Sequence, residues 1–494
     1  MCDSCSGKKL GRREFLVLNG AVGASLLMAD LAVQAAPAGE AAMQPRVKQQ
    51  ARVIAVFLYP PADVVNEGKM EDSWAPNHWF TWPGNQFEPE AQQKKFTDKI
   101  RQLAEALDIK VQFAPQAIYK RTDVDEFIAK TKQSAPDAVL VVNFWNTLSK
   151  VAFEIATQSA PTAIVYHALG SNHQLPPESL RLAEGLYYIH SIENFAEIER
   201  GLRAVRARKM LAQSRLLRVA GNVKAVSVEC EKFLETEIVS VPADELNAMF
   251  DAIVPDEALK REAADFKQQA VRVADVTDEY MVEALRAHHA VRQIVDRYGA
   301  DAITIECLML KHRKPCVSFA INNGSLLPSG CENHLDATLT LMLGRWLLDR
   351  GGFQHNPEFD TSENRYFGSH CTCAWKMQGP DGPSRPFAVR PFFHQLPKTA
   401  ALDVQWTPNE PILIAKYLSG ADTLNCWTGK VIESPTSPPV GGCATRVLAE
   451  IDGVSDVCGI YAGPHPVMFC GDRGDARRFK AFAKMYRLKL SGNI

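Results

Sequence analysis

The sequence lacks the features that mark several large classes of protein. Beyond its first 36 residues it contains no apolar run long enough to cross a lipid bilayer, so we expect no stable membrane span. Lys and Arg number 55 against 57 Asp and Glu, a balance that gives no electrostatic support for a nucleic-acid partner. Repeats, heptads and low-complexity tracts are missing, as are the P-loop, the G-x-S-x-G elbow and the H-E-x-x-H motif. We therefore expect a soluble globular protein whose site lies outside these common signatures.

The N-terminus carries the clearest local signal. Arg12 and Arg13 precede a weakly apolar stretch at 16–33, which polar residues interrupt and which is too polar for a membrane anchor. Small residues follow around Ala35, as at signal peptidase sites. We interpret residues 1–36 as a cleaved twin-arginine (Tat) signal, which makes the Tat export machinery a partner and the location periplasmic or otherwise exported. The alternative is a chance arginine pair before an uncleaved amphipathic segment.

Export has two consequences for the mature chain. Tat substrates cross the membrane folded, which suits a protein that acquires a metal before it is exported. All of the 12 cysteines except Cys2 and Cys5 follow residue 36, and an oxidising compartment permits disulfides among them. Their spacing does not select a pair.

Alternating strand and helix patterns organise the first part of the mature chain. After a Pro-, Ala- and Gln-rich linker at 37–50, apolar and β-branched runs begin at residue 52 and recur at 138–145, 162–169 and 186–192, with helical patterns between them. This alternation is typical of a parallel, doubly wound sheet. We predict an N-terminal α/β domain at 51–212.

Two further domains are predicted downstream. A second alternation of strands and helices predicts another doubly wound, Rossmann-like α/β domain at 213–354, with helices near 243–253 and 278–298. Within it, the run KPCVSFA at 314–320 is predicted as a buried strand. Beyond residue 355, Pro, Gly and aromatic residues increase and helical periodicity fades, which predicts a β-rich C-terminal domain at 355–494.

Glu306 is the last residue of the predicted strand AITIE, at the carboxyl end of a strand in a parallel sheet. Ligands and catalytic groups of such sheets gather at that edge. Glu306 is therefore a candidate site residue, and the alternative is a helix-facing or surface carboxylate.

A polar cluster opens the apolar helix predicted after a Gly and Pro loop. It contains Glu332, Asn333, His334 and Asp336, which places several potential metal ligands within one turn. Acidic residues at a helix N-terminus commonly only cap the helix and complement its dipole, an interpretation that suits Asp336. It explains His334 poorly, because an imidazolium is unfavourable at that end of a helix.

Two histidines complete the candidate set. His370 is followed by Cys371 and Cys373, and His465 lies between two prolines, both in turn-like contexts. Either histidine alone could be purely structural. Together with the carboxylates, they would suit Mn, Fe, Co or Zn, and mixed oxygen and nitrogen ligands do not choose among these metals.

The cysteines offer a competing zinc site. His370, Cys371 and Cys373 could bind zinc together with Cys331 or Cys316. The spacing argues against this site, because C-x-C is poorer than C-x-x-C for a tetrahedral structural centre and no second close pair exists.

These elements, in this order, resemble the L-fucose and L-arabinose isomerase family over nearly all of the mature chain. IECL, which contains Glu306, and the following KPCVSFA look like the family's first metal-binding carboxylate and its buried strand. GCENHLDATLTLML looks like its helix-start motif, and GSHCT is similar to the arabinose isomerase segment that supplies a metal-binding histidine. GPHPVMFCGD is similar to the closing histidine motif, and 423–451 looks like the C-terminal β domain of the family.

One position departs from the family pattern. Fucose isomerase-like members place an Asp two residues after the helix-start Glu, where this chain has His334. Arabinose isomerase-like members use the Glu itself, which is Glu332 here. The second carboxylate is therefore Glu332, or Asp336 after a local shift, or it has been replaced by an imidazole.

The resemblance implies interconversion of an aldose and a ketose through an enediol. The substrate would be a pentose or a deoxyhexose. The metal expected first is Mn²⁺, and the protein would be a homo-oligomer. A divalent ion would stabilise the enediolate, and two carboxylates would move the proton. The implied catalytic residues are Glu306 and Glu332. The implied metal ligands are Glu306, Glu332, His334 and His465. Asp336 would contact the substrate, and His370 would be either a metal ligand or a sugar contact.

Two rival interpretations share these features. Two α/β lobes behind a signal peptide also describe an exported sugar-binding protein, although the β-rich C-terminal domain and its histidines argue against it. A member with altered chemistry, such as an epimerase or lyase, would keep the same pocket. His334 and export favour this second rival, because sugar isomerases normally serve cytoplasmic catabolism.

Overall fold

The computed structural model of the chain describes residues 42–67, 88–169, 176–393, 396–435 and 443–494. The predicted Tat signal at 1–36 and the first residues of the predicted linker at 37–50 lie outside the described residues. The rest of the linker forms neither helix nor strand, and its Lys48 Nζ lies 2.8 Å from Asp301 Oδ2. The architecture is mixed α/β, with a parallel sheet followed later in the chain by a curled antiparallel one, as predicted at this level.

The first sheet is parallel throughout, in the order β2-β1-β3-β4-β5. Its strands are β1 (Ala51–Leu58), β2 (Ile109–Phe113), β3 (Ala138–Asn143), β4 (Ala163–Ala168) and β5 (Leu186–Ser191). Every residue of β3 and β4 is buried, because helices cover both faces. Helices α3 (Pro89–Ala106) and α7 (Phe195–Ala212) pack on one face and α4 (Arg121–Ser134) and α5 (Ser149–Gln158) on the other, with short helices α2 (Ala62–Asn66) and α6 (Glu178–Arg181) beside them.

The second sheet has the order β11-β10-β6-β8-β7, with only the edge strand β7 antiparallel. Its strands are β6 (Arg215–Ala220), β7 (Ser227–Cys230), β8 (Glu237–Pro242), β10 (Ala302–Ile305) and β11 (Ser329–Cys331). Helices α8 (Ala243–Ala252) and α10 (Asp278–Arg297) pack against one face of this sheet and match the predicted positions. Helices α9 (Glu257–Gln268), α11 (Cys316–Gly324) and α12 (Leu335–Leu348) complete this part of the chain.

The predicted buried strand at 314–320 is wrong. Most of this run belongs to helix α11, which follows Pro315 and ends at Gly324. All residues of α11 except Ile321 are buried, polar Ser318 and Asn322 included, so the helix has no solvent-exposed face to mark its period in the sequence. Periodicity cannot distinguish a fully buried helix from a buried strand in so short an apolar run.

The third sheet has eight strands and curls. Its order is β12-β20-β17-β18-β19-β14-β13, with β21 parallel to β18 and the other pairs antiparallel. The strands are β12 (Phe353–Gln354), β13 (Asn356–Asp360), β14 (Arg365–His370), β17 (Pro411–Leu418), β18 (Thr423–Glu433), β19 (Thr445–Ile451), β20 (Val467–Cys470) and β21 (Lys489–Gly492). A smaller sheet contains β9 (Arg272–Val273), β15 (Phe387–Arg390) and β16 (Ala401–Val404).

The last helix, α13 (Arg473–Tyr486), returns to the first sheet. Gly185 N donates to Lys484 O at 3.1 Å, and Thr162 Oγ1 donates to Met485 O at 3.1 Å. The prediction that helical periodicity fades after residue 355 missed this helix. A signal was present, because Asp472 and Asp475 form a capping box at its N-terminus.

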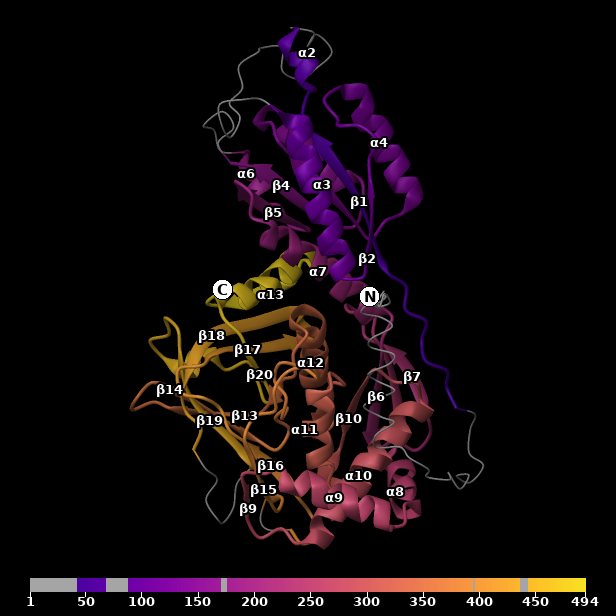
Figure 1. Cartoon of the computed structure of the whole chain (residues 1–494), viewed down its shortest axis with the longest axis vertical. Helices are drawn as coiled ribbons and strands as arrows, with labels where there is room; N and C mark the ends of the chain where they lie inside the picture. Colours follow the sequence, from indigo (N-terminus) through magenta and orange to yellow (C-terminus); the bar gives the residue numbers. More distant parts are fainter. Residues whose placement is uncertain (1–41, 68–87, 170–175, 394–395, 436–442) are drawn as a thin grey trace, which may run out of the picture.

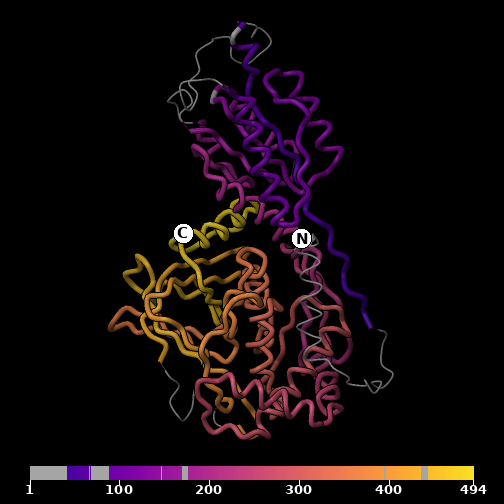
Figure 2. The backbone as a smooth tube through the Cα atoms, in the orientation of Figure 1, coloured from indigo at the N-terminus to yellow at the C-terminus, as the bar shows by residue number. Residues whose placement is uncertain are grey.

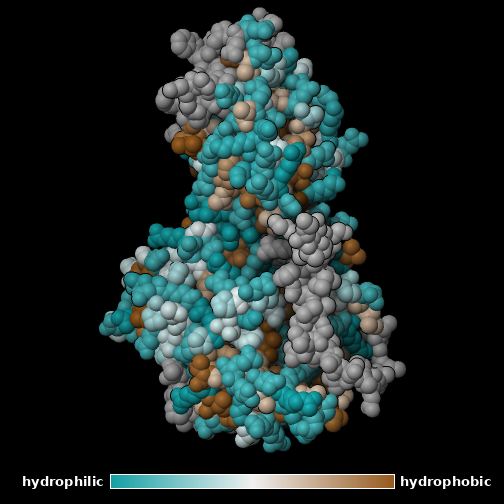
Figure 3. All heavy atoms as spheres, in the orientation of Figure 1, coloured by the Kyte–Doolittle hydropathy of each residue, from teal (hydrophilic) through white to brown (hydrophobic). Residues whose placement is uncertain are grey.

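Figures 1 and 2 show an elongated molecule. The first sheet and its helices form one end, the second and third sheets lie together at the other, and α7 and α13 run between them. The face in Figure 3 is mostly hydrophilic, with apolar residues in small scattered groups. Of the helices in the described ranges, none combines the length and the apolar character that crossing a membrane requires.

Candidate metal centre

Two strands of the second sheet end side by side at the candidate site. Ile305, the last residue of β10, pairs with Cys331, the last residue of β11, in parallel register. Glu306 and Glu332 are the next residues along each strand, so their backbones emerge together at the carboxyl edge of the sheet. This is the edge at which the sequence predicted a site.

The backbone beyond β11 adopts a conformation that few side chains favour. Glu332 has φ 58° and Asn333 has φ 54°, both in the left-handed region. Asn333 is held there because its N donates to Ile305 O at 3.0 Å and its Oδ1 accepts from Arg218 Nε at 2.9 Å. Two successive left-handed residues that are not glycine are costly, and such strain concentrates at functional sites.

Two histidines of the third sheet approach Glu332. His370 is the last residue of β14, and its Nε2 lies 3.5 Å from Glu332 Oε1. His465 precedes β20 with φ 58°, and its Nε2 lies 3.5 Å from Glu332 Oε2. The expected turn-like context is therefore right for His465 and wrong for His370, which pairs with Thr445 in a strand. Because β14 and β20 are not neighbours, the curl of the sheet is what brings the two rings together.

The imidazole nitrogens at this point are left without hydrogen-bond partners. His370 Nε2 and both ring nitrogens of His465 are buried and unpaired among the described residues, and the two residues are only 1% and 4% exposed. Buried polar atoms are almost always paired, so these atoms require an explanation such as an ion. Donor atoms about 2.1 Å from one shared ion lie about 3–3.4 Å apart, close to the 3.5 Å separations. Glu332, His370 and His465 therefore fit a divalent cation.

The electrostatics agree with this fit. Burial lowers the pKa of His465 to about 3, which keeps its nitrogens free to act as ligands. Burial opposes a proton on His370, but the Cys371 sulfur and the Glu332 carboxylate outweigh it and raise the pKa of His370 to about 10. The nearby His370 in turn lowers the pKa of Glu332. A site that favours a proton on His370 also favours a metal cation in place of that proton.

Glu306 lies at the same sheet edge but outside this ligand group. Its Oε2 accepts a hydrogen bond from Gly221 N at 2.8 Å, at the end of the neighbouring strand β6. Among the described residues, Glu332, His370 and His465 form a group in which the ligand atoms all lie within 4.8 Å of one another, and Glu306 is not part of it. The sequence thus predicted the position of Glu306 in the sheet, and the structure directs its carboxylate toward β6.

His334, and not Asp336, caps helix α12. His334 is the N-cap of α12, and its Nδ1 accepts from Ala337 N at 3.2 Å. Burial lowers the pKa of His334 to about 4, so the ring is neutral and can accept; a histidine is unfavourable at this position only as an imidazolium. Asp336 does not cap, since its Oδ1 accepts from Ser419 Oγ at 2.6 Å. The His334 ring still borders the site, with its centroid 4.9 Å from that of His465.

Lys416 belongs to this region and was not predicted. It lies in β17, is 2% exposed, and its Nζ donates to Pro464 O, next to His465. Burial lowers the pKa of Lys416 to about 8. A single lysine within the apolar run PILIAKYL was the available signal, because lysine is almost never fully buried without a partner.

Of the residues proposed for the competing zinc site, the structure brings together some and separates Cys373 from them. Cys331, His370 and Cys371 have ligand atoms within 4.8 Å of one another, and Cys316 packs against Cys371. Cys373 turns away, with its Sγ 3.7 Å from Ala374 O. Nδ1 of His370 faces the Cys371 Sγ at 3.7 Å, while Nε2 faces Glu332. His370 is therefore oriented by a thiol on one side and presented to the carboxylate on the other.

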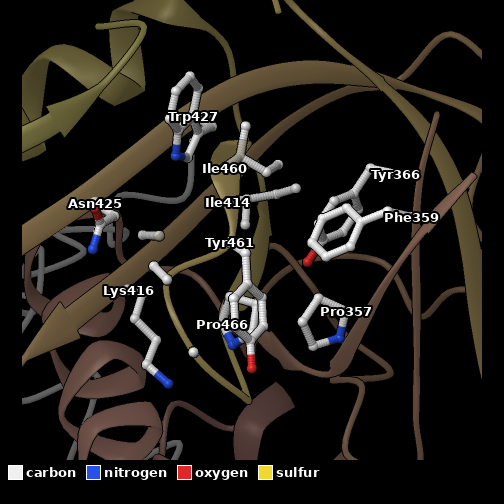
Figure 4. Close-up of a pocket in the computed structure, with 13 residues that line it drawn as sticks. Pro357, Phe359, Tyr366, Ile414, Lys416, Asn425, Trp427, Ile460, Tyr461 and Pro466 are labelled. Carbon is white, nitrogen blue, oxygen red and sulfur yellow. The ribbon is translucent and has the colours of Figure 1, made fainter. Parts of the chain in front are cut away.

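A pocket adjoins the loop that carries His465. Figure 4 shows residues of strands β13, β14, β17 and β18 and of the 460–466 segment around it. The lining is largely apolar and aromatic, and includes Phe359, Tyr366, Trp427 and Tyr461. Lys416 and Pro466 line this pocket and also flank the candidate metal centre.

Comparison of the sequence with models of known protein families and with characterised proteins gives no match. The function of the chain is therefore inferred from the geometry of this centre and from the sequence motifs that form it.

Proposed function

We propose that this protein is a metal-dependent aldose–ketose isomerase that acts on a pentose or deoxyhexose through an enediol. The observation that carries the proposal is the pair of buried imidazoles whose unpaired nitrogens face Glu332, one strand away from Glu306. The Glu332 side chain is 33% exposed, so a small polar substrate can reach the centre. The resemblance to the L-fucose and L-arabinose isomerase family supports the same reaction.

In this proposal Glu332, His370 and His465 hold a divalent cation, with Mn²⁺ as the first candidate. The ion would supply Lewis-acid polarisation of the sugar oxygens at C1 and C2. Lys416 and the left-handed backbone at Glu332 and His465 keep these ligands in place before substrate arrives. Because Nδ1 of His334 is committed to the helix, we assign His334 and Asp336 to the border of the sugar site.

The proton transfer is assigned to the carboxylates. An aldose becomes a ketose when a base removes the proton from C2 and an acid delivers a proton to C1, while a second proton passes from the O2 hydroxyl to O1, with the enediol between the two steps. Glu306 would perform this transfer after its side chain leaves Gly221 N and turns toward Glu332. Glu332 would act as ligand and as the second carboxylate.

A second candidate function is an exported sugar-binding or altered-chemistry protein with the same centre, such as an epimerase or lyase. The specific observation in its favour is the contact of Glu306 with Gly221, which directs the proposed base away from the ligand group. An altered-chemistry protein would keep the cation and differ from the isomerase in the role of Glu306, whereas a sugar-binding protein would need no cation.

Other expectations remain proposals of the same kind. They are two Rossmann-like domains at 51–212 and 213–354 followed by a β-rich domain at 355–494, a homo-oligomer, and export through the Tat machinery to the periplasm.

The test combines metal content with turnover. Metal is measured by plasma mass spectrometry on the purified chain, and ketose formation is assayed with aldopentoses and deoxyhexoses before and after chelation and Mn²⁺ addition. Glu306→Gln should keep the metal and lose at least about 100-fold in kcat, whereas Glu433→Gln, another carboxylate that ends a strand, should be silent. Normal turnover in Glu306→Gln would refute the role of Glu306 as the proton-transfer carboxylate, and no ketose formation by the unaltered, metal-loaded chain would refute the isomerase assignment. Metal without any turnover favours altered chemistry, and a chain without metal favours binding alone.

A further inference from the structure

A pair of buried thiols lies directly beside the two carboxylates. Cys307 follows Glu306, Cys331 precedes Glu332, and each cysteine is 1% exposed. Their Sγ atoms are 2.8 Å apart. Non-bonded heavy atoms normally pack at about 3.5–4.0 Å, and a disulfide bond is about 2.0 Å long, so this separation is shorter than ordinary contact.

The backbone on both sides of the pair is held in place. Cys331 pairs with Ile305 across β10 and β11, and its N donates to Gln354 Oε1 at 2.8 Å. Cys307 opens a short 3-10 helix, η2 (Cys307–Leu310), and its carbonyl oxygen accepts from Lys314 Nζ at 2.6 Å. The sulfur atoms therefore meet because two well-anchored strand ends meet.

We propose that Cys307 and Cys331 form a disulfide when the chain meets a thiol–disulfide oxidant, and that this bond fixes the strand ends that carry Glu306 and Glu332. The reaction consumes one external disulfide. The two S–H bonds of the cysteines break, one S–S bond forms between them, and the oxidant is reduced to two thiols by the two electrons and two protons released.

A thiolate metal centre is the alternative use of these cysteines. It would require four ligand atoms around one point. Within the described ranges, the compact thiol group contains only Cys331, Cys371 and His370, while Cys307 adjoins Cys331 on one side and Cys316 adjoins Cys371 on the other. The four sulfurs therefore do not form one compact group in which all ligand atoms lie close together, which favours pairing of the closest two.

The oxidant can approach from one side. The residues after Cys307 are exposed, with Leu308 at 60% and Met309 at 64%, so opening of η2 uncovers the pair. Reaction during folding, before η2 closes, is the second route. The bond itself is independent of the proposed function; only its value for holding Glu306 near Glu332 rests on that function.

The test is a disulfide map of the full chain. The reduced protein is refolded with oxidised glutathione, the remaining thiols are blocked at acid pH, and the unreduced digest is analysed by mass spectrometry. The expected result is a cross-linked peptide pair that contains Cys307 and Cys331 and separates on reduction. It should vanish in Cys307→Ser and persist in Cys426→Ser, a buried cysteine in β18.

Failure of this proposal can be distinguished from failure of the proposed isomerase function, because the disulfide map of the unaltered chain requires neither metal nor turnover. A Cys331–Cys371 cross-link, two free thiols at 307 and 331, or thiols protected by bound zinc would each overturn the proposal. If Cys307→Ser does not fold, thermal unfolding of the unaltered chain decides. The oxidised form should unfold at a higher temperature than the form kept reduced, because the cross-link restricts the unfolded chain.

Discussion

His465 Nε2 lies 3.5 Å from Glu332 Oε2, across the junction between the curled antiparallel sheet and the second parallel sheet. Both residues adopt left-handed backbone conformations, with φ of 58° in each case. The pair therefore joins two strained loops that belong to different sheets. Neither ring nitrogen of His465 has a hydrogen-bond partner among the described residues, and an ion shared with Glu332 would satisfy Nε2, the nitrogen that faces the carboxylate.

Glu332→Gln should weaken metal binding by at least about tenfold, because the carboxylate supplies both the negative charge and a ligand oxygen between the two histidines. Metal per chain after dialysis against graded chelator measures the effect. Glu235→Gln is the matched control, since Glu235 also has a left-handed backbone, with φ 59°, and its side chain is 59% exposed. Equal metal retention by the two variants would remove Glu332 from the centre.

His334→Ala should lower the free energy of unfolding by about 1 kcal/mol, because it removes the acceptor for Ala337 N at the start of α12. The free energy of unfolding should fall much less in His334→Asn, since Asn is among the residues most favoured at the N-cap. Chemical denaturation of the two variants at one pH gives the comparison. If His334→Asn is stable but loses metal, His334 is a ligand and the capping role is secondary.

Gly344→Ala should destabilise the fold by about 1–3 kcal/mol through overpacking. A Cβ at Gly344 would lie 2.1 Å from Cε1 of Phe469, which is fully buried where α12 packs on β20. The control is Gly420→Ala, where a Cβ would meet no heavy atom within 4 Å. Similar unfolding midpoints for the two variants would show that Phe469 moves aside at little cost.

Acid should destabilise the protein partly through His167. This residue is 1% exposed in β4, and burial lowers its pKa to about 3, below the value of about 6.5 expected in the unfolded chain. Between these values the unfolded chain binds the proton and the folded chain does not, so stability falls as pH drops from about 6.5 toward 3.

His167→Gln should therefore reduce the pH dependence of the unfolding free energy by about one proton in that window. Above about pH 7 the difference between variant and parent should be constant, because His167 is then neutral in both states. Denaturant titrations between about pH 4 and 8 provide the measurement. An unchanged slope below about pH 6.5 would mean that the folded protein accommodates the charged ring.

Local patterns explain which parts of the fold were predictable. The strand that ends before Glu306 and the helix that begins after the GCENH segment were readable, because their signals lie within a few neighbouring residues. The strand predicted at 314–320 failed because α11 is buried on nearly all sides and has no solvent-exposed face. The capping role of His334 was not predicted, because the protonation of this residue depends on burial, which the sequence does not state.

The sequence by itself determined most of the order of strands and helices, with α11 and α13 as exceptions, together with the place of Glu306 at a strand end and the chemical types available for a metal centre. Only the tertiary structure decided which of those side chains meet. The curl of the antiparallel sheet brings His370 and His465 to Glu332, and the register of β10 with β11 brings Cys307 to Cys331. Secondary structure follows from interactions between near neighbours in the chain, whereas these meetings depend on how separate sheets pack, which periodicity does not encode.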